Sequence, residues 1–304
     1  MLKYILILTI LVLYSAVQAQ TPVLFMNGLV STNLNERDMA ISPDGNEMYY
    51  TIQSSHGILS TIVRRKKLAN GWSDPEVAPF SGLFNDLEPA FSPDGKKLFF
   101  CSNRPLSGNK TKDYDIWVTE RTTSGWSEPM NIGPSINTTA NEFYPSVALN
   151  GNLYFTAERE GAIGNEDIFI STFANGKYNT PHPLDTAVNS KLWEFNAFVA
   201  PDESYIIFTS YGRNDDAGGG DLYISVRQNK KWLPARNLKS VNSNTIDYCP
   251  FVFDNTLYFT SGKHNVTTTR DQQMDYRSLM KWYEQSTNGG ENIYSVSFLP
   301  LLKE

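Results

Sequence analysis

The segment EPAFSPDGKKLFFCS, residues 88–102, contains two short apolar runs joined by the sequence Ser-Pro-Asp-Gly. Proline fixes φ at the first corner of a turn and glycine accepts the positive φ that follows, so the segment predicts two antiparallel strands joined by a tight turn. The aromatic and apolar residues on either side suit strands that are buried on both faces. Segments of the same design recur at intervals of 50–56 residues, at 38–51, 144–157, 196–210 and 249–261.

Each of these hairpins is followed by a third apolar run, and in the first four repeats a shorter run with an aromatic residue and a proline comes next. The third runs are residues 61–67, 115–121, 167–173, 221–227 and 292–298. The fourth runs are residues 71–75, 125–129, 177–181 and 231–234. Four antiparallel strands in a repeat of this length are typical of one blade of a β-propeller, in which each blade buries its faces against its neighbours.

The fifth repeat ends without a fourth run. The residues before the first repeat include a run of this kind that belongs to no repeat, Thr21–Phe25. This run lies about as far ahead of the first repeat as the other fourth runs lie ahead of theirs. We therefore expect an all-β, five-bladed propeller of four-stranded antiparallel blades that is closed by an N-terminal strand, residues 21–27, because closure removes the open sheet edges. The expected blades are residues 38–80, 88–135, 142–188, 194–242 and 247–299.

The last blade contains an insertion that predicts a helix, residues 265–288. Residues 269–272 fit a capping box, and Asn288-Gly289-Gly290 fits a helix end. Long insertions concentrate function, so this helix is either a lid or partner surface at the propeller mouth, or a cover packed on the rim. Its apolar residues recur at helical spacing, at Tyr276, Leu279, Met280 and Tyr283.

The N-terminus has the pattern of a secretory signal peptide, residues 1–19. A positive residue, Lys3, precedes a short apolar run, and small residues end at Ala19. The apolar run is too short to span a bilayer comfortably. We expect residues 20–304 to form a single soluble domain, periplasmic or secreted, without membrane insertion.

The composition excludes several classes of protein. A formal net charge of −6, with no basic run, disfavours binding to nucleic acids and anionic lipids. The two cysteines, Cys101 and Cys249, lie in non-adjacent repeats, which favours two buried thiols over a disulfide. Metal-ligand spacings, phosphate-binding glycine loops and the motifs of serine and zinc hydrolases are missing, so no cofactor and no metal are expected.

The Ser-Pro-Asp-Gly turn, the second strands that end in Phe-Thr-Ser or Phe-Cys-Ser, and the third strands that begin Asp-Ile-Trp or Asp-Leu-Tyr resemble the WD-like repeat of TolB-type β-propellers. The similarity covers residues 21–299 in five consecutive copies. It implies a closed propeller that works as an exported bacterial protein of the cell envelope.

Candidate site residues cluster where the first strand of each blade begins and the second ends, which is one face of a propeller. One aligned position is acidic in every repeat, and a basic residue follows the second strand in four of them. These residues either line a ligand-binding mouth or tie the blade loops together. The acids are Glu36, Asp86, Glu142, Glu194 and Asp247, and the bases are Arg104, Arg159, Arg213 and Lys263.

Two histidines depart from the repeat, His56 in blade 1 and His264 in blade 5. Closure makes these blades neighbours, so the two imidazoles could meet and bind a metal or exchange protons, or each could lie solvated in its loop. Aromatic residues near the same face could stack on sugar rings, namely Tyr114, Phe143, Tyr144, Trp193, Tyr211 and Tyr248.

The expected function is that of a monomeric, non-catalytic binding or protein-interaction module of the cell envelope, with a protein or a glycan as its partner. The alternative is a glycan-active enzyme, a glycoside hydrolase or polysaccharide lyase, that uses the acid-lined mouth. An enzyme should have a pocket with two unequal carboxyl groups at a defined separation, whereas a scaffold should have five equivalent, ion-paired ones.

Overall fold

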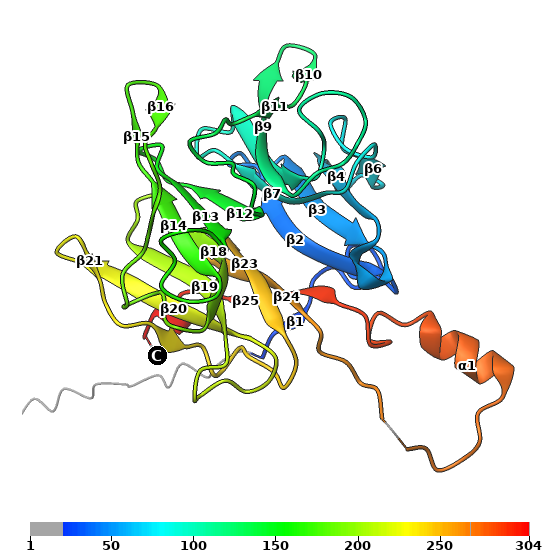
Figure 1. The fold of residues 1–304 in the computed structure, drawn as a ribbon. Helices are drawn as coiled ribbons and strands as arrows, with labels where there is room; N and C mark the ends of the chain where they lie inside the picture. The colour runs from blue at the N-terminus through cyan, green and yellow to red at the C-terminus, as the bar shows by residue number, and fades with distance from the viewer. Residues whose placement is uncertain (1–20, 268, 304) are drawn as a thin grey trace, which may run out of the picture.

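A computed structural model describes residues 21–267 and 269–303, so the predicted signal peptide lies outside the described residues. Five antiparallel sheets surround a central axis (Figure 1). Their innermost strands contact one another in ring order, and the last contacts the first. These strands are β2 (Asn35–Ile41), β7 (Asp86–Phe91), β12 (Glu142–Val147), β18 (Trp193–Val199) and β23 (Asp247–Phe253).

The second and third strands follow the repeat found in the sequence. The second strands are β3 (Glu47–Gln53), β8 (Lys97–Ser102), β13 (Leu153–Ala157), β19 (Tyr205–Tyr211) and β24 (Thr256–Ser261). The third strands are β4 (Ser60–Leu68), β9 (Asp115–Thr122), β14 (Asp167–Ser171), β20 (Asp221–Gln228) and β25 (Asn292–Ser297).

The outer edge of most blades is divided into two short pieces instead of one strand. These pieces are β5 (Gly71–Trp72) and β6 (Glu76–Val77), β10 (Gly125–Trp126) and β11 (Met130–Asn131), and β21 (Lys231–Trp232) and β22 (Arg236–Asn237). In the third blade β17 (His182–Pro183) is the outer strand, and β15 (Phe173–Ala174) and β16 (Lys177–Tyr178) form a separate hairpin. The structure also contains two single turns of 3₁₀ helix, Ser55–Gly57 and Leu301–Lys303.

The N-terminal strand closes the ring, as the sequence predicts. Strand β1 (Val23–Leu24) pairs with β25 in the fifth blade, with Val23 opposite Ser295. The Phe25 amide extends this pairing by donating to the Ile293 carbonyl at 2.9 Å. The fifth blade is therefore built from both ends of the described chain.

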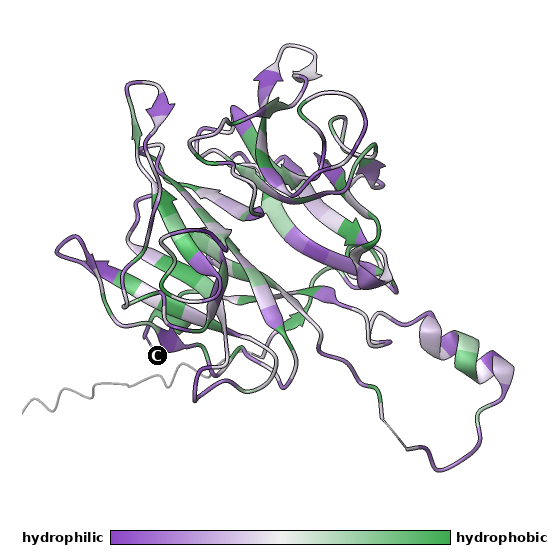
Figure 2. Ribbon diagram, viewed as in Figure 1, coloured by the Kyte–Doolittle hydropathy of each residue, from purple (hydrophilic) through white to green (hydrophobic). Residues whose placement is uncertain are grey.

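The core is divided among the contacts between blades. Each pair of neighbouring blades shares its own cluster of buried apolar side chains. The apolar residues of the blade strands are coloured green in Figure 2. A further cluster lies at the axis and contains Tyr144, Tyr248 and Cys249. Both cysteines are buried free thiols, as expected.

The insertion in the fifth blade contains one helix, α1 (Tyr276–Tyr283). It begins at Asp275, whose side chain accepts a hydrogen bond from the Ser278 amide at 2.7 Å, and not at the capping box expected at 269–272. The helix projects away from the blades (Figure 1), and its side chains Tyr276 and Tyr283 are exposed. No described helix is long and apolar enough to cross a membrane.

Candidate functional site

The five aligned carboxylates are almost completely buried, each with an exposed fraction of 0–1%. We call Glu36, Asp86, Glu142, Glu194 and Asp247 the acid ring. Each accepts hydrogen bonds from a serine or threonine in the loop that precedes its own strand. The Glu142 carboxylate, for instance, accepts from the Thr138 amide at 3.0 Å and the Thr138 hydroxyl at 2.6 Å. The corresponding partners are Thr32, Ser81, Ser190 and Ser243.

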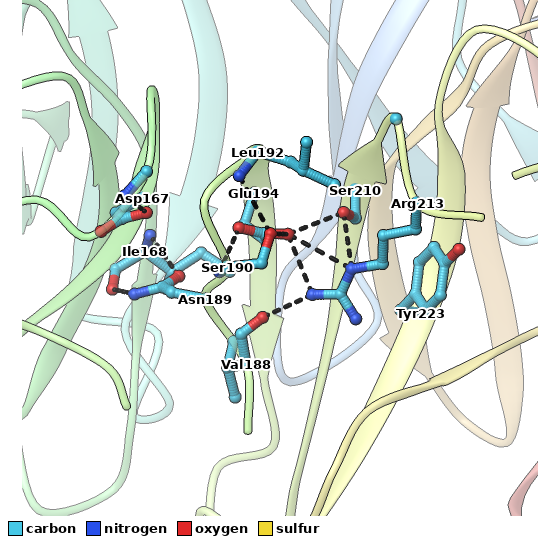
Figure 3. A network of polar contacts seen from close by, with 12 residues as sticks. Asp167, Ile168, Val188, Asn189, Ser190, Leu192, Glu194, Ser210, Arg213 and Tyr223 are labelled. Carbon is cyan, nitrogen blue, oxygen red and sulfur yellow. Dashed lines mark hydrogen bonds and ion pairs between the residues drawn. The ribbon is translucent and has the colours of Figure 1, made fainter. Parts of the chain in front are cut away.

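The arginines predicted beside the acid ring complete these contacts. Figure 3 shows Arg213, whose guanidinium lies 2.9 Å from Glu194 and donates to the Val188 carbonyl at 2.7 Å. Arg104 binds Asp86 and the Phe80 carbonyl in the same way, and Arg159 lies 3.8 Å from Glu142. The repeated acids and arginines thus tie each inner strand to its preceding loop. Ligand binding by the acid ring and its bases stays a prediction.

Lys263 and the two histidines predicted to form a paired site lie in loops. The Lys263 backbone amide donates to the Ser261 hydroxyl at 3.1 Å. His56 and His264 are both exposed, and the His264 ring accepts a hydrogen bond from the Val266 amide at 3.1 Å. Within residues 21–267 and 269–303, no hydrogen bond connects the two imidazoles. A paired histidine site therefore stays a prediction.

A second set of five aligned residues lies two positions beyond the acid ring. At this point the pairing between first and second strands shifts in every blade. One residue of each inner strand there adopts a positive φ, between 49° and 60°. Such a bulge redirects its side chain out of the strand pattern, here toward the propeller axis. All five are buried and all five differ: Asp38, Glu88, Tyr144, Asn196 and Cys249.

We call these five residues, together with Arg37, the channel plug, and hydrogen bonds join the side chains of all of them except Tyr144. The Arg37 guanidinium binds Asp38 at 2.7 Å and Glu88 at 3.0 Å. The Cys249 thiol donates to Asp38 at 2.7 Å, and the Asn196 side chain donates to Glu88 at 3.2 Å. Four blades therefore contact one another through this polar network at the axis.

A break in the repeat explains the remaining contact of Glu88. In three blades the backbone amide of the plug residue donates to a threonine of the preceding blade, at Thr51, Thr156 and Thr260. The second blade has Cys101 at this position. The Tyr144 amide that should meet it donates instead to the Glu88 carboxylate at 2.7 Å. Glu88 thus satisfies a buried donor that the repeat leaves without its usual partner.

The plug lies beneath a cavity of about 320 Å³ that side chains from all five blades line. We call it the mouth pocket. Its polar side chains include Arg37, Glu88, Thr156, Glu166 and Asn196, and its aromatic walls are Tyr114, Phe143, Phe195 and Tyr248. Three of the six aromatic residues expected to face a sugar, Tyr114, Phe143 and Tyr248, are in these walls. A second, apolar cavity lies against Glu88 and Tyr144 and is lined by proline and phenylalanine side chains.

The mouth pocket holds two carboxyl groups of altered acidity. Burial, together with the nearby Glu88 and Glu158 carboxylates, raises the pKa of Glu166 to about 7. Burial and the Asp38 charge also raise the pKa of Glu88, against the opposing effect of Arg37. Among the described residues, no hydrogen bond or ion pair reaches the Glu166 carboxyl group.

The plug also brings together three side chains of metal-ligating type. Oxygen or sulfur atoms of Asp38, Glu88 and Cys249 lie within 4.8 Å of one another. The Arg37 guanidinium already binds both carboxylates, and burial raises the pKa of the Cys249 thiol well above its usual value. A metal would require a thiolate and would compete with a fixed cation, so these residues do not fit a metal centre.

Several solved structures are similar to this chain. TolB from Acinetobacter baumannii matches with a TM-score of 0.46 and 14% identity, covering 86% of this chain, which spans 55% of that protein's length. A putative TolB from Agrobacterium tumefaciens matches at 0.48 and 16%, covering 87% and 91% of the two chains. The α-L-arabinofuranosidase PaAbf62A from Podospora anserina, in complex with cellotriose, matches at 0.52 and 9%, covering 91% and 95%.

The expected five-bladed propeller is confirmed by its sheets and by their closure through β1, and the similarity to TolB is one of fold alone, since identities this low show no more. No protein-family model matches the chain, and no curated protein matches it.

The sequence pointed to the acid ring and missed the plug. A signal for the plug was nevertheless present, because the position two residues after each ring acid differs in every repeat. In three repeats a proline follows it, at Pro89, Pro145 and Pro250. Glu166 gave no signal of its own, since it precedes a third strand in a loop of ordinary composition.

Proposed function

We propose that this chain is an exported, non-catalytic binding module of the bacterial cell envelope, and that its mouth pocket takes a glycan. The observation that carries the proposal is the composition of one cavity to which all five blades contribute. Aromatic walls suit the apolar faces of sugar rings, and convergent polar groups suit their hydroxyls.

The polar groups of the pocket include both hydrogen-bond donors and acceptors. The Nε and Nη2 atoms of Arg37 are engaged with the plug, while its Nη1 has no partner among the described residues. Asn196 uses its amide nitrogen on Glu88, which leaves its carbonyl oxygen as an acceptor. Glu166 supplies a further acceptor. Hydroxyl groups, which donate and accept, fit such a mixture.

A pair of exposed aromatic rings extends this surface at the rim. Trp193 and Tyr211 are 39% and 46% exposed, and their ring centroids lie 5.6 Å apart. The backbone of Trp193 forms a bridge with that of Glu166, which places the pair beside the mouth pocket. The rim therefore supports a ligand longer than one sugar.

The alternative is a glycan-active enzyme, a glycoside hydrolase or polysaccharide lyase, and the raised pKa values of Glu88 and Glu166 favour it. A glycosidase needs two carboxyl groups that face the scissile bond. Protein donors already occupy both oxygens of Glu88, through Arg37, Asn196 and the Tyr144 amide. Glu166 alone is left for a ligand, and one carboxyl group supports binding better than hydrolysis.

Calorimetric titration of the purified protein with cello-, xylo- and chito-oligosaccharides tests the proposal. We expect at least one series to bind, and Trp193→Ala to weaken that binding about tenfold, a loss of about 1.4 kcal/mol. Trp282→Ala, on the projecting helix, is the matched control and should bind normally. Chromatography after long incubation should recover the sugars intact, whereas cleaved products would establish the enzyme. Failure of every series to bind would refute the glycan proposal.

A further inference from the structure

The charges around the mouth pocket do not balance. Arg37 carries the positive charge of the plug, and it contacts two carboxylates, Asp38 and Glu88. Glu166 adds a third carboxyl group to this set, and the second that lines the pocket, without adding a cation. A confined cavity with this excess of acids attracts a positively charged ligand, because low-polarity walls strengthen the field of each unpaired charge.

Glu166 is held in place although no described residue forms a hydrogen bond or ion pair with its carboxyl group. Its backbone carbonyl accepts a hydrogen bond from the Glu194 amide at 2.8 Å, and its strand position is bridged to Trp193. The backbone is therefore fixed by the inner strand of the next blade. Burial and the Glu88 charge raise its pKa to about 7, as expected for an acid that lacks a counter-ion.

The aromatic walls favour a cation for an independent reason. The faces of aromatic rings attract cations, most strongly where water is excluded. One wall already does so within the protein, since the Arg37 guanidinium lies 4.9 Å from the Tyr248 ring centroid. Across the pocket, Tyr114 and Phe143 form a second aromatic pair, with centroids 5.2 Å apart, and neither carries a cation among the described contacts.

From these observations we infer that the glycan bound in the mouth pocket carries a free amino group, whose ammonium pairs with Glu166 beside Tyr114 and Phe143. This inference rests on the proposed glycan-binding function and names the chemical class of the sugar: an amino sugar that is not acetylated. Glu166 is then the residue that determines specificity, while the plug supplies the floor of the site.

Three tetrasaccharides with the same β-1,4 backbone test this inference, because they differ only at carbon 2. The glucosamine tetramer carries ammonium groups there, the N-acetylglucosamine tetramer carries neutral amides, and cellotetraose carries hydroxyls. In calorimetric titrations at pH 7 and low salt, the glucosamine tetramer should bind at least tenfold more tightly than the other two.

Variants then assign the preference to Glu166. Glu166→Gln keeps the shape of the side chain and removes its charge, so it should reduce the preference to about twofold or less. Glu284→Gln removes the same charge from the exposed end of α1 and should keep it. Circular dichroism melting of both variants establishes that they fold.

The outcomes separate the two proposals. Equal binding of all three tetrasaccharides, or a preference that survives Glu166→Gln, would overturn the amino-sugar inference and leave glycan binding intact. Absence of binding by all three would overturn the amino-sugar inference and, if the xylo-oligosaccharides also fail to bind, the glycan proposal as well. Nα-acetyl-lysine amide, added as a fourth titrant, carries the ammonium without the sugar. Its binding in place of the tetrasaccharides would reassign the pocket to a peptide and refute the inference.

Discussion

The acid ring and the channel plug lie two residues apart on the same five inner strands, yet they obey opposite rules. Every blade keeps a carboxylate in the ring and ties it to the loop before its own strand. Every blade places a different residue in the plug, and there the contacts run between blades. A contact needed once per blade is repeated with the blade, whereas a surface that meets one ligand must be asymmetric. The repeat therefore identifies the scaffold, and departures from it identify the candidate site.

The largest effect should follow from removing the strand on which all five blades depend. Deletion of residues 20–27 removes β1, leaves β25 without its outer partner and opens the ring. We expect a loss of about 5 kcal/mol and a fall in melting temperature of roughly 10–20 °C. Replacing α1, none of whose described residues is buried, with a Gly-Ser linker is the control and should change melting little. Unchanged melting of the deletion would refute closure by β1.

The next largest effect should come from the plug. Arg37→Met leaves Asp38 and Glu88 buried without their cation and should cost about 3–5 kcal/mol in urea unfolding at pH 7. Part of the lost stability should be regained near pH 5, because protonation of the two carboxylates removes the uncompensated charges. Lys97→Met breaks an exposed pair with Glu120 and should cost less than about 1 kcal/mol. Similar costs for both variants would mean that the plug is not a buried ion-pair network.

Two adjacent substitutions sharpen the comparison directly. Glu194→Gln weakens the contacts to Ser190, Ser210 and Arg213 and should lower the free energy of unfolding by about 2 kcal/mol, with ligand affinity unchanged. Trp193→Ala, one residue earlier, should lower the ligand affinity and leave the free energy of unfolding nearly unchanged. Unfolding in urea and calorimetric titration of the two variants measure both quantities. Loss of affinity in Glu194→Gln would show that the acid ring itself contacts the ligand.

The smallest effect concerns the pH dependence of stability. The Glu166 pKa is about 7 in the folded protein and 4.5 when exposed. Between these values the folded state holds a proton that the unfolded state has released, so stability falls as pH rises from 4.5 through 7. Glu166→Gln abolishes this contribution. Its melting temperature should exceed that of the wild type by a few degrees at pH 8 and equal it at pH 4. A lower melting temperature at pH 8 would show that the charged carboxylate is stabilised in the fold.

The blade pattern could be predicted from the sequence because turn chemistry and strand burial act over a few residues. Ser-Pro-Asp-Gly determines the geometry of its own turn. The spacing between fourth runs and the repeats that follow them was enough to assign the unpaired run at Thr21–Phe25 to the fifth blade. The acid ring was visible for the same reason, since it repeats with the blade. Its role as a tie to Thr138, Ser190 and their counterparts was one of two alternatives left open.

The mouth pocket could not be predicted, because its geometry depends on a bulge and on blades far apart in the sequence. Nothing local to Asp38 or Cys249 indicates a positive φ, and residues this distant meet only after the ring closes. Burial is the largest cause of the raised pKa of Glu166, and the charge of the Glu88 carboxylate, from another blade, adds to it. The start of α1 at Asp275 was missed because two capping residues, Thr269 and Asp275, compete within one insertion.

The pairing of β1 with β25 also sets a sequence of events in time. Residues 23–24 are made by the ribosome well before their partners in β25, residues 292–297. The propeller therefore cannot close until β25 has been synthesised, and β1 has an unpaired edge until then. A chain that passes through a membrane before folding gains from this order, because early residues cannot lock a native ring around an unfinished polypeptide. The same order leaves the edge of β1 exposed, so β1 is the segment to which we most expect a chaperone to bind.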